Sequence, residues 1–253
     1  MNGKLSILGI GVSLTDYART IDAVISAAKE RRPLRVTALA VHGLMEGFYD
    51  KDLAHNLNSF DIVTPDGQPV KWALNLLGAK EIKDRVCGPV LMFKICERAA
   101  PEKIPVFFYG SKKEILERLE ANLLKLCPGL IVAGVKADRF RDTTPDEDRE
   151  DIDTINGSGA LIVFVGKGCP RQEKWIAAHG LRIRGATIAV GAAFDFHAGM
   201  LKRPSKFFQD LGLEWAFRLA QEPRRLWKRY ILLNPAFVFN LCLQLLKVKK
   251  YNT

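Results

Sequence analysis

Six short apolar runs, rich in β-branched residues, are spaced along the first two hundred residues of the chain. Uninterrupted apolar runs of this length are typical of strands that are buried on both faces of a sheet. A further apolar run within residues 5–14 predicts a strand near the N-terminus. The six predicted strands are Leu34–Val41, Asp61–Val63, Pro105–Tyr109, Leu130–Val135, Leu161–Val165 and Thr187–Val190.

Between these runs, apolar residues recur at intervals of three and four, which predicts helices that each pack one face on the sheet. Two of the helix starts have the spacing of a capping box: Ser111 precedes Glu114, and Thr144 precedes Glu147. The predicted helices are Thr20–Arg31, Gly88–Ala99, Glu114–Leu126, Pro145–Ile155 and Gln172–His179.

The alternation of strands and helices predicts an α/β fold with a Rossmann-like parallel sheet and helices on both of its faces. The alternation ends near Lys202, and only helical patterns follow. We therefore expect a Rossmann-like core over residues 1–201 that folds by itself, and a small basic helical appendage over residues 202–253. In such sheets, ligands bind beyond the carboxyl ends of the strands.

The excess of positive charge lies mainly at the C-terminal end of the chain. The protein has 38 Lys and Arg against 28 Asp and Glu, a net charge of +10. Residues 202–253 contain 11 Lys and Arg against 3 Asp and Glu, interleaved with Phe, Trp and Tyr. A segment that is both basic and aromatic fits an anionic membrane surface. Nucleic acid is an alternative partner, and a solvated amphipathic helix pair packed on the core is a third interpretation.

Other features narrow the class of protein. The five cysteines are scattered without a C-x-x-C pair, which argues against a zinc site or a disulfide framework. No apolar run reaches the roughly 20 residues of a membrane-spanning helix, so we expect a soluble or peripheral protein rather than an integral one. The four histidines lack metal-ligand spacing, and the acidic run Asp146–Asp153 begins a predicted helix. We predict no metal site and no cofactor.

Four loops that follow predicted strands carry small or polar residues, and all would lie at one edge of a parallel sheet. They are T-P-D-G around Asp66, the pair Gly110-Ser111, a loop that starts at Gly166, and a loop that starts at Gly191. Each is a weak signal alone, because T-P-D-G is a common turn and Gly-Ser often caps a helix. Together they predict a ligand site at that edge.

Three side chains near this edge are candidates for chemistry. Asp66 is either a turn aspartate bonded to its own backbone or a general base that takes a proton from a hydroxyl. Asp195 lies between Phe194 and Phe196, so it either caps a turn or accepts hydrogen bonds from a ligand. His42 is a candidate for the lining of the same edge.

Five ordered motifs between Leu5 and Pro235 resemble those of the WecG/TagA/CpsF family, glycosyltransferase family 26. They are T-P-D-G-Q-P-V (64–70), R-V-C-G-P (85–89), G-K-G-C-P-R-Q-E-K-W (166–175), G-A-A-F-D-F-H-A-G (191–199) and G-L-E-W-A-F-R-L-A-Q-E-P-R-R-L-W-K-R-Y (212–230). The resemblance implies an inverting, metal-independent enzyme that moves a hexose from a UDP-sugar to a polyprenyl-diphosphate-linked sugar. Such enzymes act at the inner face of the bacterial cell membrane, in the assembly of exopolysaccharides or other cell-surface glycans.

The resemblance also implies roles for single residues. Asp66 matches the candidate base, and Arg85 matches a catalytic arginine near a diphosphate. The predicted UDP-sugar residues are Thr37, His42, Gly110, Ser111, Gly166, Gln172, Gly191 and Asp195. The predicted acceptor-diphosphate residues are Arg218, Arg225 and Lys228. Residues 202–253 would then associate with an anionic membrane and complete the active site, with nucleic acid not expected as a partner.

Two places depart from the family pattern. Many members have an asparagine soon after the first threonine, where this chain has Ala38 and Leu39 after Thr37, and a polar or acidic pair where it has Pro89-Val90. Both places are expected near the donor sugar, so a plain hexose such as glucose is favoured, with N-acetylmannosamine as the alternative. The sequence leaves the acceptor sugar, the pathway and the oligomeric state open, and a homo-oligomer is compatible with it.

Overall fold

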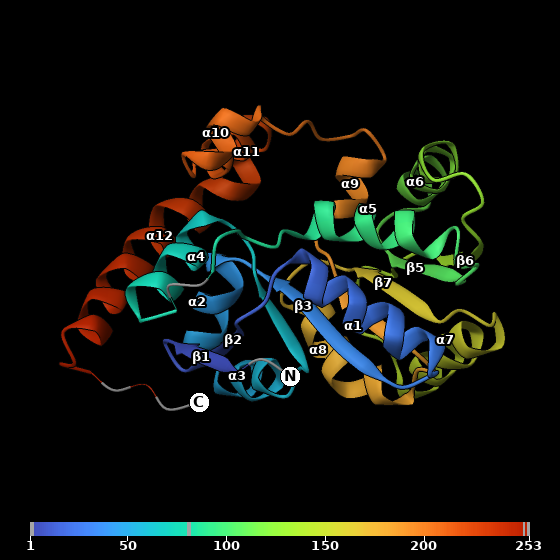
Figure 1. Ribbon diagram of the computed structural model, residues 1–253, viewed down its shortest axis with the longest axis horizontal. Helices are drawn as coiled ribbons and strands as arrows, with labels where there is room; N and C mark the ends of the chain where they lie inside the picture. Colours follow the sequence, from blue (N-terminus) through green and yellow to red (C-terminus); the bar gives the residue numbers. More distant parts are fainter. Residues whose placement is uncertain (1–2, 80–81, 250, 252–253) are drawn as a thin grey trace. The chain divides into compact units, whose positions relative to one another are not determined.

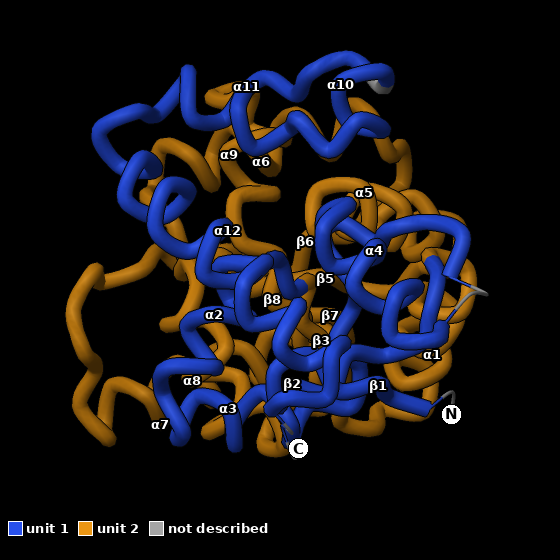
Figure 2. Tube along the Cα trace, turned by 90° about the vertical axis from the view of Figure 1, so that its left-hand side faces the viewer, with its two compact units in different colours: residues 1–16, 39–87, 202–253 blue, residues 17–38, 88–201 orange. Residues whose placement is uncertain are grey.

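The computed structural model describes residues 3–79, 82–249 and 251. Its chain divides into two compact units, which Figure 2 shows in different colours. Unit 1 contains residues 1–16, 39–87 and 202–253, and unit 2 contains residues 17–38 and 88–201. The chain returns to unit 1 between Leu201 and Lys202, the position at which the sequence predicts the start of the appendage. The predicted core over residues 1–201, however, is shared between the two units.

Unit 2 contains five parallel strands in the order β3-β8-β7-β5-β6. Their bounds are Leu34–Leu39 for β3, of which Leu39 counts to unit 1, Val106–Gly110 for β5, Val132–Lys136 for β6, Ile162–Gly166 for β7 and Ala186–Ala189 for β8. Thr37 is in register with Ala189, and Gly110 is in register with Gly166, so the carboxyl ends of these strands lie at one edge. β5 and β8 are buried along their whole length, as uninterrupted apolar runs predict.

Helices cover both faces of this sheet (Figure 1). Right-handed crossovers place α6, which connects β5 to β6, on the face opposite to α7 and α8. On the side of α6, α9 packs on α6 and α5, and α5 packs on α1. The predicted α/β class with a parallel sheet covered on both faces is thus confirmed. The helices are α1 (Tyr17–Lys29), α5 (Gly88–Ala99), α6 (Lys113–Leu126), α7 (Pro145–Gly157), α8 (Arg171–His179) and α9 (Ala193–His197).

The two predicted capping boxes have different outcomes. Thr144 caps α7 as predicted: its hydroxyl accepts from the Glu147 amide at 3.2 Å, and the Glu147 carboxylate accepts from the Thr144 amide at 2.9 Å. The prediction of a capping box at Ser111 is wrong, because the N-cap of α6 is Lys112, one residue later than predicted. Ser111 instead adopts a left-handed conformation with a φ of 63°.

Unit 1 begins with a hairpin in which β1 (Lys4–Ile7) pairs antiparallel with β2 (Ile10–Ser13). The two turn residues, Leu8 and Gly9, have positive φ values of 51° and 88°, the backbone twist that suits a two-residue hairpin turn. The sequence predicts a strand here, but the structure shows a separate two-stranded sheet.

Three helices of unit 1 were not predicted. They are α2 (Val41–Tyr49), α3 (Lys51–Asn58) and α4 (Gln68–Leu76), with strand β4 (Ile62–Pro65) between α3 and α4. The predicted strand Leu34–Val41 is two residues too long because Val41 already starts α2. Asp50 ends α2 and caps α3, since its carboxylate accepts from the Asp52 and Leu53 amides at 3.0 Å.

Residues 202–249 form helices only, as predicted: α10 (Lys206–Asp210), α11 (Glu214–Gln221) and α12 (Pro223–Leu245). α12 packs on α2 and buries Leu226, Phe237 and Leu241. The side chain of Gln244 also accepts from the Leu8 amide at 3.0 Å and donates to the Ser6 carbonyl at 2.8 Å. These helices are therefore an integral part of unit 1. None of the helices in the described part of the chain is long and apolar enough to cross a membrane.

Candidate active site

Asp66 and Arg85 come together in unit 1, although α4 separates them in the chain. The segment around Val86 runs beside the end of β4: the Thr64 hydroxyl donates to the Val86 carbonyl at 3.0 Å, and the Val86 amide donates to the Pro65 carbonyl at 2.9 Å. These bonds hold the two motifs T-P-D-G and R-V-C-G next to each other. The Asp66 carboxylate consequently acts electrostatically on the Arg85 guanidinium.

The side chain of Arg85 is only 9% exposed and is held by residues of α10 and α11. Its Nη1 donates to Glu214 Oε2 at 2.6 Å, and its Nη2 donates to Gln209 Oε1 at 2.9 Å. Burial opposes the charged form, but attraction to Glu214 above all, and to Cys87 and Asp66, raises the pKa of Arg85 above its usual value. Arg85 is thus a permanent cation beside the candidate base.

The turn between α10 and α11 depends on Gly212. Its φ of 73° lies in the left-handed region, and a Cβ at this position would lie 2.8 Å from the ring of Trp72 in α4. Glycine therefore allows both the turn and its close approach to α4. The turn brings Gln209 and Glu214 to Arg85, a role of the G-L-E-W motif that the sequence did not reveal.

A chain of hydrogen bonds joins three predicted donor-site residues at the carboxyl edge of the unit 2 sheet. The Thr37 hydroxyl donates to Glu173 Oε1 at 3.1 Å, and Gln172 Nε2 donates to the same oxygen at 2.8 Å. The Gly191 amide donates to Gln172 Oε1 at 3.2 Å. Both ends of the Gln172 amide are thus engaged, so this buried side chain holds the start of α8 to the loop after β8.

Glu173 is the member of this chain of bonds that the sequence analysis missed. Its side chain is buried, and its Oε2 has no hydrogen-bond partner within the described residues. Burial raises the pKa of Glu173, and the hydrogen bonds from Gln172 and Thr37 offset this effect only in part. Its place in the first turn of a predicted helix is typical of an ordinary dipole-stabilising acid. The tertiary fold turns it inward instead.

The remaining predicted donor residues of unit 2 lie at the same edge. Gly110 is the last residue of β5 and Ser111 follows it, with φ values of 112° and 63°. A Cβ on Gly110 would lie 2.7 Å from the backbone of Gly166, and a Cβ on Gly166 would lie 2.6 Å from the ring of Phe194. A side chain at either position would collide with these neighbours, so both positions require glycine. Asp195 follows Phe194 within α9, directly after β8.

His42, another predicted donor-site residue, belongs to unit 1 and lies in the first turn of α2. Its Nε2 lies 3.2 Å from Glu46 Oε1, and its Nδ1 is buried with no hydrogen-bond partner in the described part of the chain. Burial, followed by the charges of Arg229 and Arg225, lowers the pKa of His42 to about 3. The imidazole is therefore neutral at neutral pH and is associated with the arginines of α12.

The three predicted acceptor residues lie on α11 and α12. Glu222, between the two helices, accepts from Arg218 Nη2 at 3.4 Å and from Arg225 Nη2 at 2.5 Å. One carboxylate thus holds two guanidinium groups near each other. Lys228 is exposed, and its Nζ lies 5.6 Å from the centre of the Trp227 ring.

α10, α11 and α12 combine this positive charge with exposed apolar side chains. An exposed apolar area next to basic residues is typical of a segment that contacts a membrane surface or a partner. The large exposed apolar residues are Phe207, Phe208, Leu211, Leu213, Trp215, Phe217, Trp227, Ile231, Leu232, Val238 and Phe239.

The acidic residues of α7 pair with cations. Asp151 lies 2.6 Å from Lys136 Nζ and 2.7 Å from Arg139 Nη1, and its side chain is fully buried. Asp146 lies 3.0 Å from Arg149 Nη1. Over residues 3–79, 82–249 and 251, no group of three or more His, Cys, Asp or Glu side chains is placed to hold a metal ion.

Comparison with known proteins places this geometry in context. The model of the glycosyl transferase WecG/TagA/CpsF family matches residues 5–251. A curated relative from Bacillus spizizenii, named N-acetylglucosaminyldiphosphoundecaprenol N-acetyl-β-D-mannosaminyltransferase, is 32% identical over 176 residues. That match covers 69% of this chain and 66% of the relative, slightly less than two thirds of its length.

Proposed function

Because the chain belongs to the glycosyl transferase WecG/TagA/CpsF family, we propose that it transfers a hexose from a UDP-sugar to a polyprenyl-diphosphate-linked sugar. The observation that carries this proposal is the placement of the Asp66 carboxylate beside the buried cation Arg85. Both residues lie in motifs that match the family. The name of the Bacillus relative, with its diphosphoundecaprenol-linked substrate, supports the class of acceptor.

Asp66 is the general base in this proposal. As the acceptor hydroxyl oxygen attacks the anomeric carbon of the donor, the Asp66 carboxylate accepts the hydroxyl proton. The bond between that carbon and the UDP oxygen breaks, and its electron pair leaves with UDP. Attack on the face opposite to UDP inverts the configuration at the anomeric carbon.

The negative charge that develops on UDP needs stabilisation in the transition state. Cationic side chains and backbone N–H groups at helix starts supply it without a metal ion. We assign the donor to the carboxyl edge of unit 2, where α8 and α9 begin after the loops at Gly166 and Gly191. Arg85 of unit 1 is the cation that we assign to the developing negative charge.

The donor sugar is proposed as a hexose of the glucose or N-acetylmannosamine type. The Bacillus relative is named for transfer of N-acetylmannosamine. The segments after Thr37 and after Gly88, which differ from the family pattern, favour a hexose without the acetamido group. A direct comparison of both donors on the same acceptor decides between them.

The helices α10–α12 are the proposed membrane-facing part of the protein. Their exposed Trp and Phe side chains suit the boundary between lipid head groups and acyl chains, and their arginines suit anionic phosphates. We assign Arg218, Arg225 and Lys228 to the acceptor diphosphate. The protein would then work as a peripheral enzyme at the inner face of the bacterial cell membrane, in the assembly of exopolysaccharide or another cell-surface glycan.

A transfer assay with the full chain tests the proposal. A panel of UDP-sugars is incubated with a short-chain prenyl-diphosphate-linked N-acetylglucosamine, and the glycosylated lipid and its anomeric configuration are determined. We expect one hexose donor to give a product of inverted configuration. Absence of product with every UDP-sugar, for a protein that is folded and binds UDP, would contradict the proposed activity.

A further inference from the structure

The region around Arg85 contains a second guanidinium group, from Arg203, that no motif assigned. Arg203 Nη2 donates to Gln209 Oε1 at 2.8 Å, the same oxygen that accepts from Arg85 Nη2. Arg203 Nε lies 3.5 Å from Glu214 Oε1, while Arg85 binds the other oxygen of that carboxylate. Two shared acceptors therefore hold two like charges side by side within unit 1.

Holding two guanidinium groups together costs free energy, because like charges repel each other. The Glu214 carboxylate and the neutral Gln209 amide bind both guanidinium groups, and the Asp66 carboxylate offsets a further part of the repulsion through its attraction to Arg85. The Gln209 amide is fixed in turn, because its Nε2 donates to the Pro204 carbonyl at 2.8 Å. The arrangement is thus preorganised for a ligand that supplies further negative charge.

Donor groups remain available for such a ligand. Each guanidinium has five N–H groups. The hydrogen bonds that Arg203 makes within the described residues all come from Nη2, which also donates to Cys87 Sγ at 3.5 Å. The Arg203 side chain is 25% exposed, against 9% for Arg85, so Arg203 is the more accessible member of the pair.

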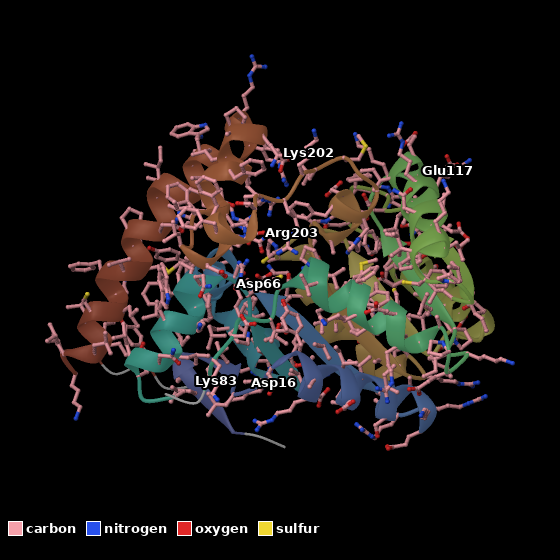
Figure 3. All side chains as sticks on the ribbon, turned by 45° about the horizontal axis from the view of Figure 1, so that its top comes forward. Asp16, Asp66, Lys83, Glu117, Lys202 and Arg203 are labelled. Carbon is pink, nitrogen blue, oxygen red and sulfur yellow. The ribbon has the colours of Figure 1, made fainter. Side chains whose placement is uncertain are left out.

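We propose that Arg203 and Arg85 form a paired-guanidinium site for a diphosphate next to Asp66, with Glu214 and Gln209 as the positioning residues. Guanidinium groups bind phosphate oxygens through two parallel hydrogen bonds, a geometry that a lysine lacks. Asp66 and Arg203 are both labelled in Figure 3. The inference rests on the proposed function, in which both the UDP donor and the lipid acceptor carry a diphosphate.

Substitution of Arg203 in the full chain tests this inference. Arg203→Met removes the guanidinium, Arg203→Lys keeps the charge but removes the paired donors, and Lys202→Met is the matched control. Lys202 is exposed, and its hydrogen bonds with Gln221 involve only its backbone, so Lys202→Met removes an adjacent charge without disturbing the pair. Calorimetry gives the Kd for UDP and for inorganic pyrophosphate, kinetics gives KM for the prenyl-diphosphate acceptor, and thermal unfolding reports folding.

We expect Arg203→Met to lower the affinity for one of the two diphosphates by about 10- to 100-fold, as loss of a hydrogen bond to a charged group does. Arg203→Lys should lower this affinity less. A weaker Kd for UDP identifies the donor diphosphate, and a higher KM for the acceptor identifies the lipid diphosphate. Lys202→Met should match the wild type in both.

The positioning role of Glu214 has its own readout. In the wild-type background, Glu214→Gln should lower the affinity for the same diphosphate. In the Arg203→Met background it should have little further effect, whereas a purely structural role of Glu214 would make the two losses of affinity additive. If both Arg203 variants fold like the wild type and bind UDP, pyrophosphate and acceptor unchanged, the paired site does not exist. A wild-type protein that transfers no hexose would refute the proposed function instead, and the UDP and pyrophosphate measurements would still decide this inference.

Discussion

At the scale of single residues, the carboxylate of Asp66 has the environment of a base that works beside a fixed cation. Arg85 cannot lose its charge, because Glu214 and Asp66 both favour the guanidinium form. We expect Asp66→Asn to retain UDP binding and to lose transfer activity by about 10²–10⁴-fold, the usual contribution of a general base. The measurement is kcat with saturating donor and acceptor, together with the Kd for UDP. Transfer within a few-fold of the wild-type rate would remove Asp66 from this role.

Glu173 leads to a prediction on stability. Burial raises the pKa of Glu173 in the folded state above the usual 4.5, which applies in the unfolded state. Between the unfolded-state pKa and the folded-state pKa, the folded protein therefore binds more protons than the unfolded protein. The free energy of unfolding then falls as pH rises through this interval, which is the sign for an acid with a raised pKa. Glu173→Gln has no such titration. We expect the free energy of unfolding of Glu173→Gln to increase relative to that of the wild type as the pH rises from 5 to 8.

Urea unfolding at both pH values measures this difference. The control is Glu117→Gln in α6, where the side chain is 62% exposed (Figure 3). Its stability should follow the wild type at both pH values. Parallel pH dependence of Glu173→Gln and the wild type would mean that Glu173 is not protonated on folding.

At the scale of elements, α12 decides whether residues 202–253 can be separated from the remainder of the chain. The sequence favours a core that folds without them, because the strand–helix alternation is complete by Leu201. The structure favours the opposite, since α12 fills unit 1 with Leu226, Phe237 and Leu241. We expect truncation after Leu201 to expose the apolar face of α2 and to lower solubility, measured by expression and by binding of a hydrophobic dye.

Two phenylalanines of α12 give a sharper version of the same prediction. Phe237 is 2% exposed and Phe239 is 65% exposed, although only one residue separates them. We expect Phe237→Ala to lower the free energy of unfolding by about 3–5 kcal/mol, as for other buried aromatic residues. Phe239→Ala should leave stability almost unchanged and instead weaken binding to liposomes. Equal stability of the two variants would contradict the packing of α12 in unit 1.

At the scale of the whole molecule, the net charge of +10 favours binding to an anionic partner. We expect the full chain to bind anionic liposomes, and the binding to weaken with salt, because each basic residue near the surface contributes about 1 kcal/mol of screened attraction. Co-sedimentation with anionic and neutral vesicles at two salt concentrations measures this. Retention on DNA with no vesicle binding would favour the nucleic-acid interpretation.

The chemistry of the whole enzyme leads to one more prediction. Asp146 and Asp151, two acids of the run Asp146–Asp153, are paired with Arg149, Lys136 and Arg139. Stabilisation of UDP by cationic side chains and helix starts should therefore suffice, and transfer activity should persist in excess EDTA. Activity that is lost on chelation and recovered with magnesium or manganese would require a different mechanism.

The amino-acid sequence was sufficient to predict the features that depend on local pattern. All six strands predicted before Lys202 are present, because short uninterrupted apolar runs rich in β-branched residues are typical of strands in a covered sheet. The Thr144 cap and the helices after residue 202 followed from capping chemistry and from helical spacing in the same way. The motifs that match the family were also readable, since each is a short contiguous run.

Contacts between residues that are distant in the chain could not be predicted and follow from the three-dimensional packing. The division into two units, the separate hairpin at the N-terminus, the inward orientation of Glu173 and the pairing of Arg203 with Arg85 have no local signature. Each depends on long-range packing, in which burial and charge pairing outweigh local preference. Glu214 shows the reason: its sequence neighbours predict a helix start, but its function follows from a guanidinium group that lies more than a hundred residues earlier in the chain.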